Sequence, residues 1–186
     1  MVQAFDVKHI GTSGAIFDPE KLKWVNGMWL RNMDLDSYEK LVTPYIDEAV
    51  KGNFDRRQIA AILQQRAQTL AEIPEMLTFF DNFPSYSNDL FINKKMKTDP
   101  TIALKSLKAS YEALKNQEDW SEEALHTTLL ALPAKLEMKN GQVLFPLRLA
   151  ITGMQFTPGG AIEISSILGK EETLRRLELS IQQLQQ

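Results

Sequence analysis

Arg66 stands where its guanidinium could take part in recognition. It lies four residues after Ile62 and four before Leu70, within the apolar stripe of an expected helix. A charge on such a face is costly unless it is paired or partly open to solvent. Two interpretations are open. Arg66 is either a residue at the edge of the core, paired with a carboxylate or with helix-capping carbonyls, or a rigidly held donor of paired hydrogen bonds to a base edge.

A second arginine, Arg148, follows Leu147 at the margin of another apolar stripe. It is close in sequence to the glycine- and proline-containing turn at 153–160, which a helix end would present at the surface. Taken alone, the position of Arg148 favours an ordinary surface residue over a ligand-binding one.

The sequence lacks the signatures of catalysis. It contains no phosphate-loop, dinucleotide-binding, zinc-protease or nucleophile-elbow motif. The segment Gly11-Thr12-Ser13-Gly14 lacks the lysine and the preceding strand of a phosphate loop. There is no cysteine, and the two histidines, His9 and His126, are too few for most histidine metal sites. We therefore expect no catalytic residue, metal or cofactor in this chain.

The charge of the chain is unevenly distributed. The net charge of −3 over 186 residues argues weakly against a dedicated nucleic-acid binder. Between Asn93 and Asn116, however, six lysines face only Asp99 and Glu112, a surplus of four positive charges. Such a segment could present a surface for phosphate, but its charge alone favours a solvated helix face. The six lysines are at positions 94, 95, 97, 105, 108 and 115.

The elements that must position these residues are helices. Apolar residues recur three and four apart after each of several start signals, and two more helices are expected around residues 143–151 and 174–184. No segment sustains the period-two alternation of strands, so we predict an all-α fold. The start signals are Asp18-Pro19-Glu20, Asp36 with Glu39, Asp55 with Gln58, Asp99-Pro100, and Ser121, whose helix should bend or end at Pro133.

Two further expectations concern organisation and location. The polar stretch from Asp81 to Lys97 is the best candidate for a linker between helical units. No segment is long and apolar enough to span a bilayer, and Met1 to Ile10 lack the apolar core of a signal peptide. We expect a cytoplasmic protein.

Six segments spread over essentially the whole chain form an ordered set of motifs. They are Phe17 to Arg31 (F-D-P-E-K-L-K-W-V-N-G-M-W-L-R), Thr69 to Ile73 (T-L-A-E-I), Asp119-Trp120-Ser121, Pro146 to Gly153 (P-L-R-L-A-I-T-G), Thr157-Pro158-Gly159 and Leu168 to Glu171 (L-G-K-E). Together, and in this order, they resemble bacterial glutamyl-tRNA synthetases, and the segment at Pro146 to Gly153 is the most specific of them. The family's ATP-binding fold and its two signature motifs are missing, so we expect the anticodon-binding part of a longer enzyme.

This resemblance implies a helical bundle followed by an α-helical cage, in three parts. Residues 1–32 would end the stem-contact region, 33–95 would form the first anticodon-binding subdomain, and 96–186 would form the second. The helix with Trp24 and Asn26 would pack beside the catalytic core and approach the inner stem of the tRNA.

The resemblance also implies which residues read the anticodon. Arg66 would read the third base and separate glutamate from glutamine codons, whereas a second group would surround the first base. Between Pro158 and Gly169 the chain is one residue longer than the family pattern, so the contact after the turn, at Gly160 or Ala161, stays unassigned. The second group consists of Leu147, Arg148, Thr157 and Pro158.

The implied partners are tRNA-Glu and the enzyme's own catalytic domain, which would hold ATP and Mg²⁺; neither DNA nor membrane is expected, and the protein should be a monomer. Two alternatives remain. The chain could be a helical protein-interaction module that kept the fold without RNA binding, or the equivalent part of a relative that does not discriminate between glutamate and glutamine tRNAs.

Overall fold

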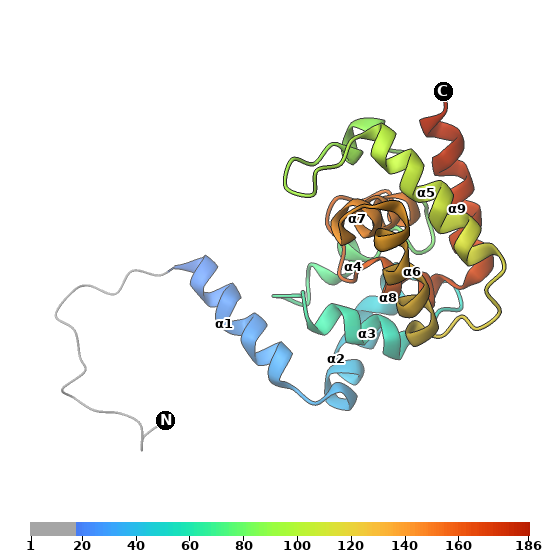
Figure 1. Cartoon of the computed structure of the whole chain (residues 1–186). Coiled ribbons are helices and arrows are strands. Elements are labelled where there is room, and N and C mark those ends of the chain that lie inside the picture. Colours follow the sequence, from blue (N-terminus) through green and yellow to red (C-terminus); the bar gives the residue numbers. More distant parts are fainter. Residues whose placement is uncertain (1–17) are drawn as a thin grey trace, which may run out of the picture.

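Nine α-helices and one short 3-10 helix form the regular structure of residues 18–186, the part of the chain that the computed structural model describes (Figure 1). In this range there is no β-strand, only an isolated antiparallel bridge between Asn93 and Thr98. The predicted all-α fold is confirmed. In chain order the helices are α1 (Pro19–Asn32), α2 (Leu35–Ala49), α3 (Arg56–Gln64), α4 (Ile73–Met76), η3 (Asn88–Phe91), α5 (Pro100–Lys115), α6 (Glu122–Leu136), α7 (Asn140–Thr152), α8 (Ala161–Leu168) and α9 (Lys170–Leu184).

Four of the five predicted helix starts are confirmed, each by a side chain that accepts backbone N–H groups of the first turn. Asp18 caps α1, Asp55 caps α3, Asp99 caps α5 and Ser121 caps α6. The last of these helices continues through Pro133 and ends at Leu136.

The predicted cap at Asp36 is wrong. Helix α2 begins at Leu35, and Asp34 accepts the backbone N–H of Ser37 at 2.9 Å. This hydrogen bond lowers the pKa of Asp34 below its usual value. Asp36 lies inside the first turn and pairs instead with Arg57 of α3 at 2.7 Å. Asp34 and Asp36 both lie where they could cap this helix, and the structure uses Asp34, the earlier one.

The helices pack in two groups (Figure 1). Helix α2 lies against α3 and α4, while α5 packs against α6, α7 and α9. Helix α8 joins the groups because it packs on α6, α7 and α9 and also contacts α3. Helix α1 extends from the first group as an arm (Figure 1). The predicted division at residues 32 and 95 stays a prediction.

The polar stretch from Asp81 to Lys97 connects the groups, but it is not a free linker. Phe91 is fully buried, and the Tyr86 hydroxyl lies 2.5 Å from the hydroxyl of Ser180 on α9. Gln183 donates to the carbonyl oxygen of Tyr86 at 2.8 Å. The aromatic residues inside the stretch attach it to the second group, which outweighs its polar composition.

Arg176 of α9 is the largest fully buried side chain, with 1% of its surface exposed. Its guanidinium donates to the carbonyl oxygens of Phe79, Ile151 and Phe80 at 2.8, 2.8 and 3.0 Å, and to Glu172 at 2.6 Å. One side chain therefore ties α9 to the end of α7 and to the segment after α4.

Some sequence features fall on residues 1–17, outside the described part of the chain. These are the segment Gly11 to Gly14, His9, the region tested for a signal peptide, and most of the first predicted domain. Within residues 18–186, no helix has the length and hydropathy needed to cross a membrane.

Candidate functional site

Helix α7 presents Arg148 at the surface from an otherwise buried segment. Its neighbours Leu147 and Leu149 are fully buried, whereas Arg148 is half-buried. Pro146 is inside the helix, and the segment is apolar almost throughout. Because residues 145–147 and 149–152 of α7 are buried, the backbone that carries the Arg148 side chain is held in place.

The end of α7 fixes the direction of the loop that follows. Gly153 adopts φ +65°, and its N–H donates to the carbonyl oxygen of Leu149 at 2.7 Å. A Cβ atom at Gly153 would come within 2.7 Å of Pro84 Cγ, so this position requires glycine both for its backbone angle and for space. Thr152 donates to the carbonyl oxygen of Arg148 and accepts the N–H of Met154.

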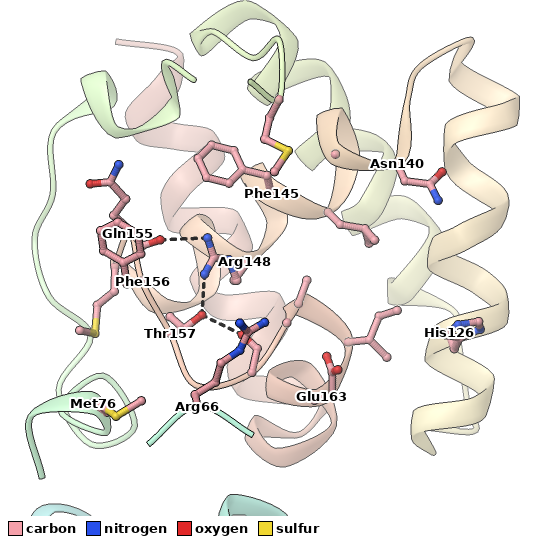
Figure 2. Close-up of a pocket in the computed structure, with 18 of the residues that line it drawn as sticks. Arg66, Met76, His126, Asn140, Phe145, Arg148, Gln155, Phe156, Thr157 and Glu163 are labelled. Atoms are coloured by element: carbon pink, nitrogen blue, oxygen red, sulfur yellow. Dashed lines mark hydrogen bonds between the residues drawn. The ribbon is translucent and has the colours of Figure 1, made fainter. Parts of the chain in front are cut away.

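The loop then folds back over Arg148. The guanidinium donates through Nη1 to the hydroxyl of Thr157 at 2.7 Å and through Nη2 to the carbonyl oxygen of Gln155 at 2.9 Å (Figure 2). The Thr157 hydroxyl in turn donates to the carbonyl oxygen of Gly159 at 2.8 Å. Two of the five N–H groups of Arg148 therefore hold the loop, and these two hydrogen bonds fix the guanidinium plane.

Arg66 reaches the same place from the other helical group. Helix α3 ends at Gln64, and Arg66 lies in the turn that follows, with its N–H bonded to the carbonyl oxygen of Leu63 at 2.9 Å. The expectation that Arg66 lies on the apolar stripe of a helix is wrong, because the helix stops two residues earlier and the side chain is exposed. This exposure disfavours the interpretation as a buried ion pair.

Close packing at Gly159 brings the two arginines together. A Cβ atom at Gly159 would meet Ile62 of α3 at 3.2 Å and Ile164 of α8 at 3.3 Å, so the turn lies directly on the end of α3. Figure 2 shows Arg66 and Arg148 extending toward Thr157 from opposite sides. Both line an open hollow of about 1140 Å³, bounded by α6, α7, the start of α8 and the loop 153–160.

The hollow contains charges of both signs, because Arg66 and Arg148 share its lining with Glu72, Glu75 and Glu163. Burial and, second, the positive charge of Arg66 lower the pKa of Arg148. Of the carboxylates on the wall, Glu72 accepts the backbone N–H groups of Gln68 and Thr69. The two guanidiniums thus repel each other across the hollow, and a ligand that accepts hydrogen bonds from both relieves this repulsion.

The other predicted site residues differ in their burial and in their access to the hollow. Leu147 is fully buried, so its side chain belongs to the core beneath Arg148 and cannot touch a ligand here. Pro158 is buried in the wall of a second, smaller hollow that Arg66 also lines. Thr157 is half-buried beside Arg148. These loop residues shape the site mainly through Thr157 and the backbone.

Trp24 and Asn26 lie on α1, away from the hollow. Asn26 donates to the carbonyl oxygen of Gln68 at 2.5 Å, which attaches α1 to the turn after α3. Trp24 is 53% exposed and stands among other exposed apolar residues of α1. The side chains exposed with it are Leu22, Val25, Met28 and Trp29.

The six lysines between 94 and 115 are exposed on α5 and on the turn before it. None of them lines the hollow in the described part of the chain. Their position favours the interpretation as a solvated face.

Sequence reasoning missed several residues of the hollow. Phe145 packs beneath Arg148, with the guanidinium carbon 5.7 Å from its ring centroid. His126 of α6 forms the far wall, and Gln155 and Phe156 form the near edge (Figure 2). The spacing of Phe145 three residues before Arg148 on one helix was the available signal; nothing in the sequence connected His126 to the site.

Comparison with known proteins agrees with this geometry. A family model described as an anticodon binding domain matches residues 36–181. The chain belongs to the anticodon-binding domain family. Among curated relatives, the glutamate–tRNA ligase of Clostridium tetani is 44% identical over 184 residues, and that of Clostridium acetobutylicum is 43% identical over 186 residues. The two alignments cover 99% and 100% of this chain but 38% of each relative.

A solved structure gives the same result. The crystal structure of a glutamate–tRNA ligase from Elizabethkingia meningosepticum superposes with a TM-score of 0.74 and 26% identity, over 97% of this chain and 35% of that one. The glutamate–tRNA synthetase of Elizabethkingia anophelis, at 22% identity and a TM-score of 0.71, shares the fold. This chain corresponds to the C-terminal anticodon-binding region of glutamate–tRNA ligases, as the resemblance predicted.

Proposed function

We propose that this anticodon-binding chain recognises the anticodon loop of tRNA-Glu and serves a parent enzyme that joins glutamate to that tRNA with ATP. The observation that carries the proposal is the meeting of Arg66 and Arg148 in one open hollow, although they come from different helical groups. Anticodon bases are single-stranded and can splay outward, so their hydrogen-bonding edges can enter such a hollow.

The two arginines have different roles in this proposal. Arg148, fixed by Thr157 and Gln155, contacts the first anticodon base together with the turn at Pro158. Arg66 is exposed, follows the end of α3, and reads the third base, at which glutamate and glutamine anticodons differ. A bidentate arginine contributes about 1–3 kcal/mol of discrimination in well-characterised DNA complexes, or roughly 5- to 150-fold.

The arm α1 fits a contact with the remainder of the enzyme. Its exposed apolar residues form a surface that water solvates poorly, and the chain spans only 38% of the length of the curated relatives. We place this face beside the catalytic domain, with Trp24 and Asn26 near the inner stem of the tRNA. In an enzyme that carries both parts, Trp29 should be shielded from acrylamide quenching; quenching equal to that in this chain would exclude the contact.

The test of anticodon reading is fluorescence-anisotropy binding of the purified chain to anticodon stem-loops at two salt concentrations. The set contains a glutamate C-U-C loop, a glutamine C-U-G loop and a scrambled loop. We expect preference for the glutamate loop, and loss of that preference in Arg66→Gln. Equal affinity for all three loops, falling steeply with salt, would reduce the interaction to a nonspecific phosphate contact and overturn the proposal.

Because Arg66 is exposed, Arg66→Gln should leave the free energy of unfolding within about 0.5 kcal/mol of the wild type. Thermal melting of the variant checks this. A large loss of stability would return Arg66 to the role of a structural ion-pair partner.

A further inference from the structure

Phe156 is exposed to an unusual degree for its type. Its side chain is 80% exposed, more than any other large apolar residue in the described part of the chain. Phe79, Phe80 and Phe91, by contrast, are at most 2% exposed. Leaving a phenyl ring in water forgoes the burial free energy that a core position provides, so the position of Phe156 calls for a partner.

The backbone on both sides of Phe156 is held by the same arginine. Arg148 donates to the carbonyl oxygen of Gln155 and to the hydroxyl of Thr157, the residues immediately before and after the phenylalanine. The loop also leaves α7 in one direction, because Gly153 packs against Pro84. Phe156 is therefore a free ring on an anchored backbone at the near edge of the hollow, on the side opposite His126 (Figure 2).

A nucleobase matches this combination better than a protein side chain does. The hollow places guanidinium donors at its centre and the exposed ring of Phe156 at its edge. A base needs both, since its edge forms hydrogen bonds while its face stacks. Apolar side chains such as Leu144 and Met154 also line the hollow, and alone they would suit an apolar protein side chain. Arg66 and Arg148 favour a partner that also accepts hydrogen bonds.

We infer that Phe156 is a stacking platform for one base of the anticodon loop, adjacent to the base that Arg148 contacts. This inference rests on the proposed function. Stacking requires a planar face rather than apolar volume, so it separates aromatic from aliphatic residues at this position.

The experiment compares Phe156→Leu, which keeps apolar volume and removes the face, with Phe156→Trp, which enlarges the face. Leu179→Ala, at an apolar residue 41% exposed on α9 and away from the hollow, is the control for loss of an exposed apolar side chain. Affinity for the glutamate stem-loop is measured by anisotropy. A second set of loops carries 2-aminopurine at each anticodon position in turn, because its fluorescence falls when it stacks. Melting curves of all variants establish that they are folded.

Stacking predicts that Phe156→Leu weakens binding about 5- to 150-fold, corresponding to about 1–3 kcal/mol, while Phe156→Trp and Leu179→Ala bind like the wild type. Quenching of 2-aminopurine at one position should be lost in Phe156→Leu. If the wild type binds and Phe156→Leu binds equally well with unchanged quenching, the stacking role is wrong and the anticodon role stands. If the wild type does not prefer the glutamate loop, both proposals fail.

Discussion

Arg176 and Arg148 use their guanidinium groups in opposite ways. Arg176 connects α9 to the end of α7 and to the segment after α4, a region called the joint below, whereas Arg148 lines the hollow. Burial lowers the pKa of both arginines. At the joint, Glu172 and three carbonyl oxygens surround the guanidinium, which is 1% exposed. At the hollow, the nearby charge that acts on Arg148 is a second arginine, Arg66.

Under the proposed function, this difference assigns Arg176 a structural role and Arg148 a role in binding. At the joint, the hydrogen-bonding capacity of the guanidinium is used within the protein, so the side chain fixes how the helical groups meet. At the hollow, two N–H groups of Arg148 are used within the protein, by Thr157 and Gln155. Changes at the joint should therefore lower stability, whereas changes at the hollow should lower RNA affinity.

The largest effect is expected from Arg176→Met. The substitution leaves the carbonyl oxygens of Phe79, Phe80 and Ile151 without their donor and Glu172 without one of its partners. Removing one member of a buried ion pair typically costs about 3–5 kcal/mol. We expect a loss of this size in the free energy of unfolding, measured by urea denaturation with circular dichroism. A loss below about 1 kcal/mol would show that α9 is held by its apolar contacts alone.

The second effect is acid sensitivity at the same joint. Hydrogen bonds from Arg175, and then from Arg176, lower the pKa of Glu172 from 4.5 to about 2, against the opposing effect of burial. Because the folded pKa is depressed, the stabilisation is complete above pH 4.5 and is lost as the pH falls toward 2. The shift sets an upper bound of about 3–4 kcal/mol, and solvent screening lowers the actual contribution because the Glu172 side chain is 28% exposed.

Glu172→Gln should remove this part of the acid sensitivity. Between pH 5 and pH 2, the unfolding free energy of the wild type should fall more steeply than that of the variant. Glu171→Gln, at the exposed neighbouring carboxylate, is the matched control and should follow the wild-type curve. Parallel curves for Glu172→Gln and wild type would show that the carboxylate contributes equally in the folded and unfolded chain.

At the hollow, the third prediction concerns Arg148→Lys. Lysine keeps the positive charge, but its ammonium group cannot reproduce the planar pair of donors to Thr157 and Gln155. We expect the affinity for the glutamate stem-loop to fall by about 1–3 kcal/mol, or roughly 5- to 150-fold, with little change in stability. Arg148→Ala should weaken binding without changing the preference at the third anticodon base.

Anisotropy titrations and melting curves of the same preparations separate the two readouts. If Arg148→Lys binds like the wild type, charge alone suffices and the fixed guanidinium plane is unnecessary. If Arg148→Lys melts far below the wild type, Arg148 stabilises the fold as Arg176 does, and the contrast between the two arginines is wrong.

The sequence predicted local structure well because capping is a local interaction. Asp18, Asp55, Asp99 and Ser121 each meet backbone groups two or three residues away, so spacing alone identifies them. The error at Asp36 has the same origin, since Asp34 offers an equivalent spacing and local rules do not rank the two.

Contacts between distant segments were harder to predict. The stretch from Asp81 to Lys97 has the composition of a linker, yet Tyr86 and Phe91 attach it to the second group across more than 90 residues of sequence at Ser180. Arg176 bonds to the carbonyl oxygens of Phe79 and Phe80 across 97 and 96 residues. Only its i,i+4 relation to Glu172 was visible in the sequence.

The candidate site shows both limits. Arg66 and Arg148 attracted attention because charges beside apolar stripes are costly, but the stripe of Arg66 was extended two residues too far. Leu147 came only from the resemblance, and full burial removes it from direct contact. Phe156 gave no signal, because periodicity does not reveal whether an apolar residue in a loop is buried or exposed.

The smallest effect, and the finest test of the comparison, is expected from Thr157→Val. Valine keeps the shape of threonine but removes the hydroxyl that accepts from Arg148 and donates to the carbonyl oxygen of Gly159. Loss of one such connection costs about 0.5–1.5 kcal/mol, or roughly 2- to 12-fold in stem-loop affinity. Thr157→Ser retains the hydroxyl and should recover most of the affinity. Because the turn stays packed on Ile62 through Gly159, both variants should melt like the wild type. If valine binds like the wild type and serine weakens binding, the contribution of Thr157 is its methyl group, and the arginine is held by Gln155 instead.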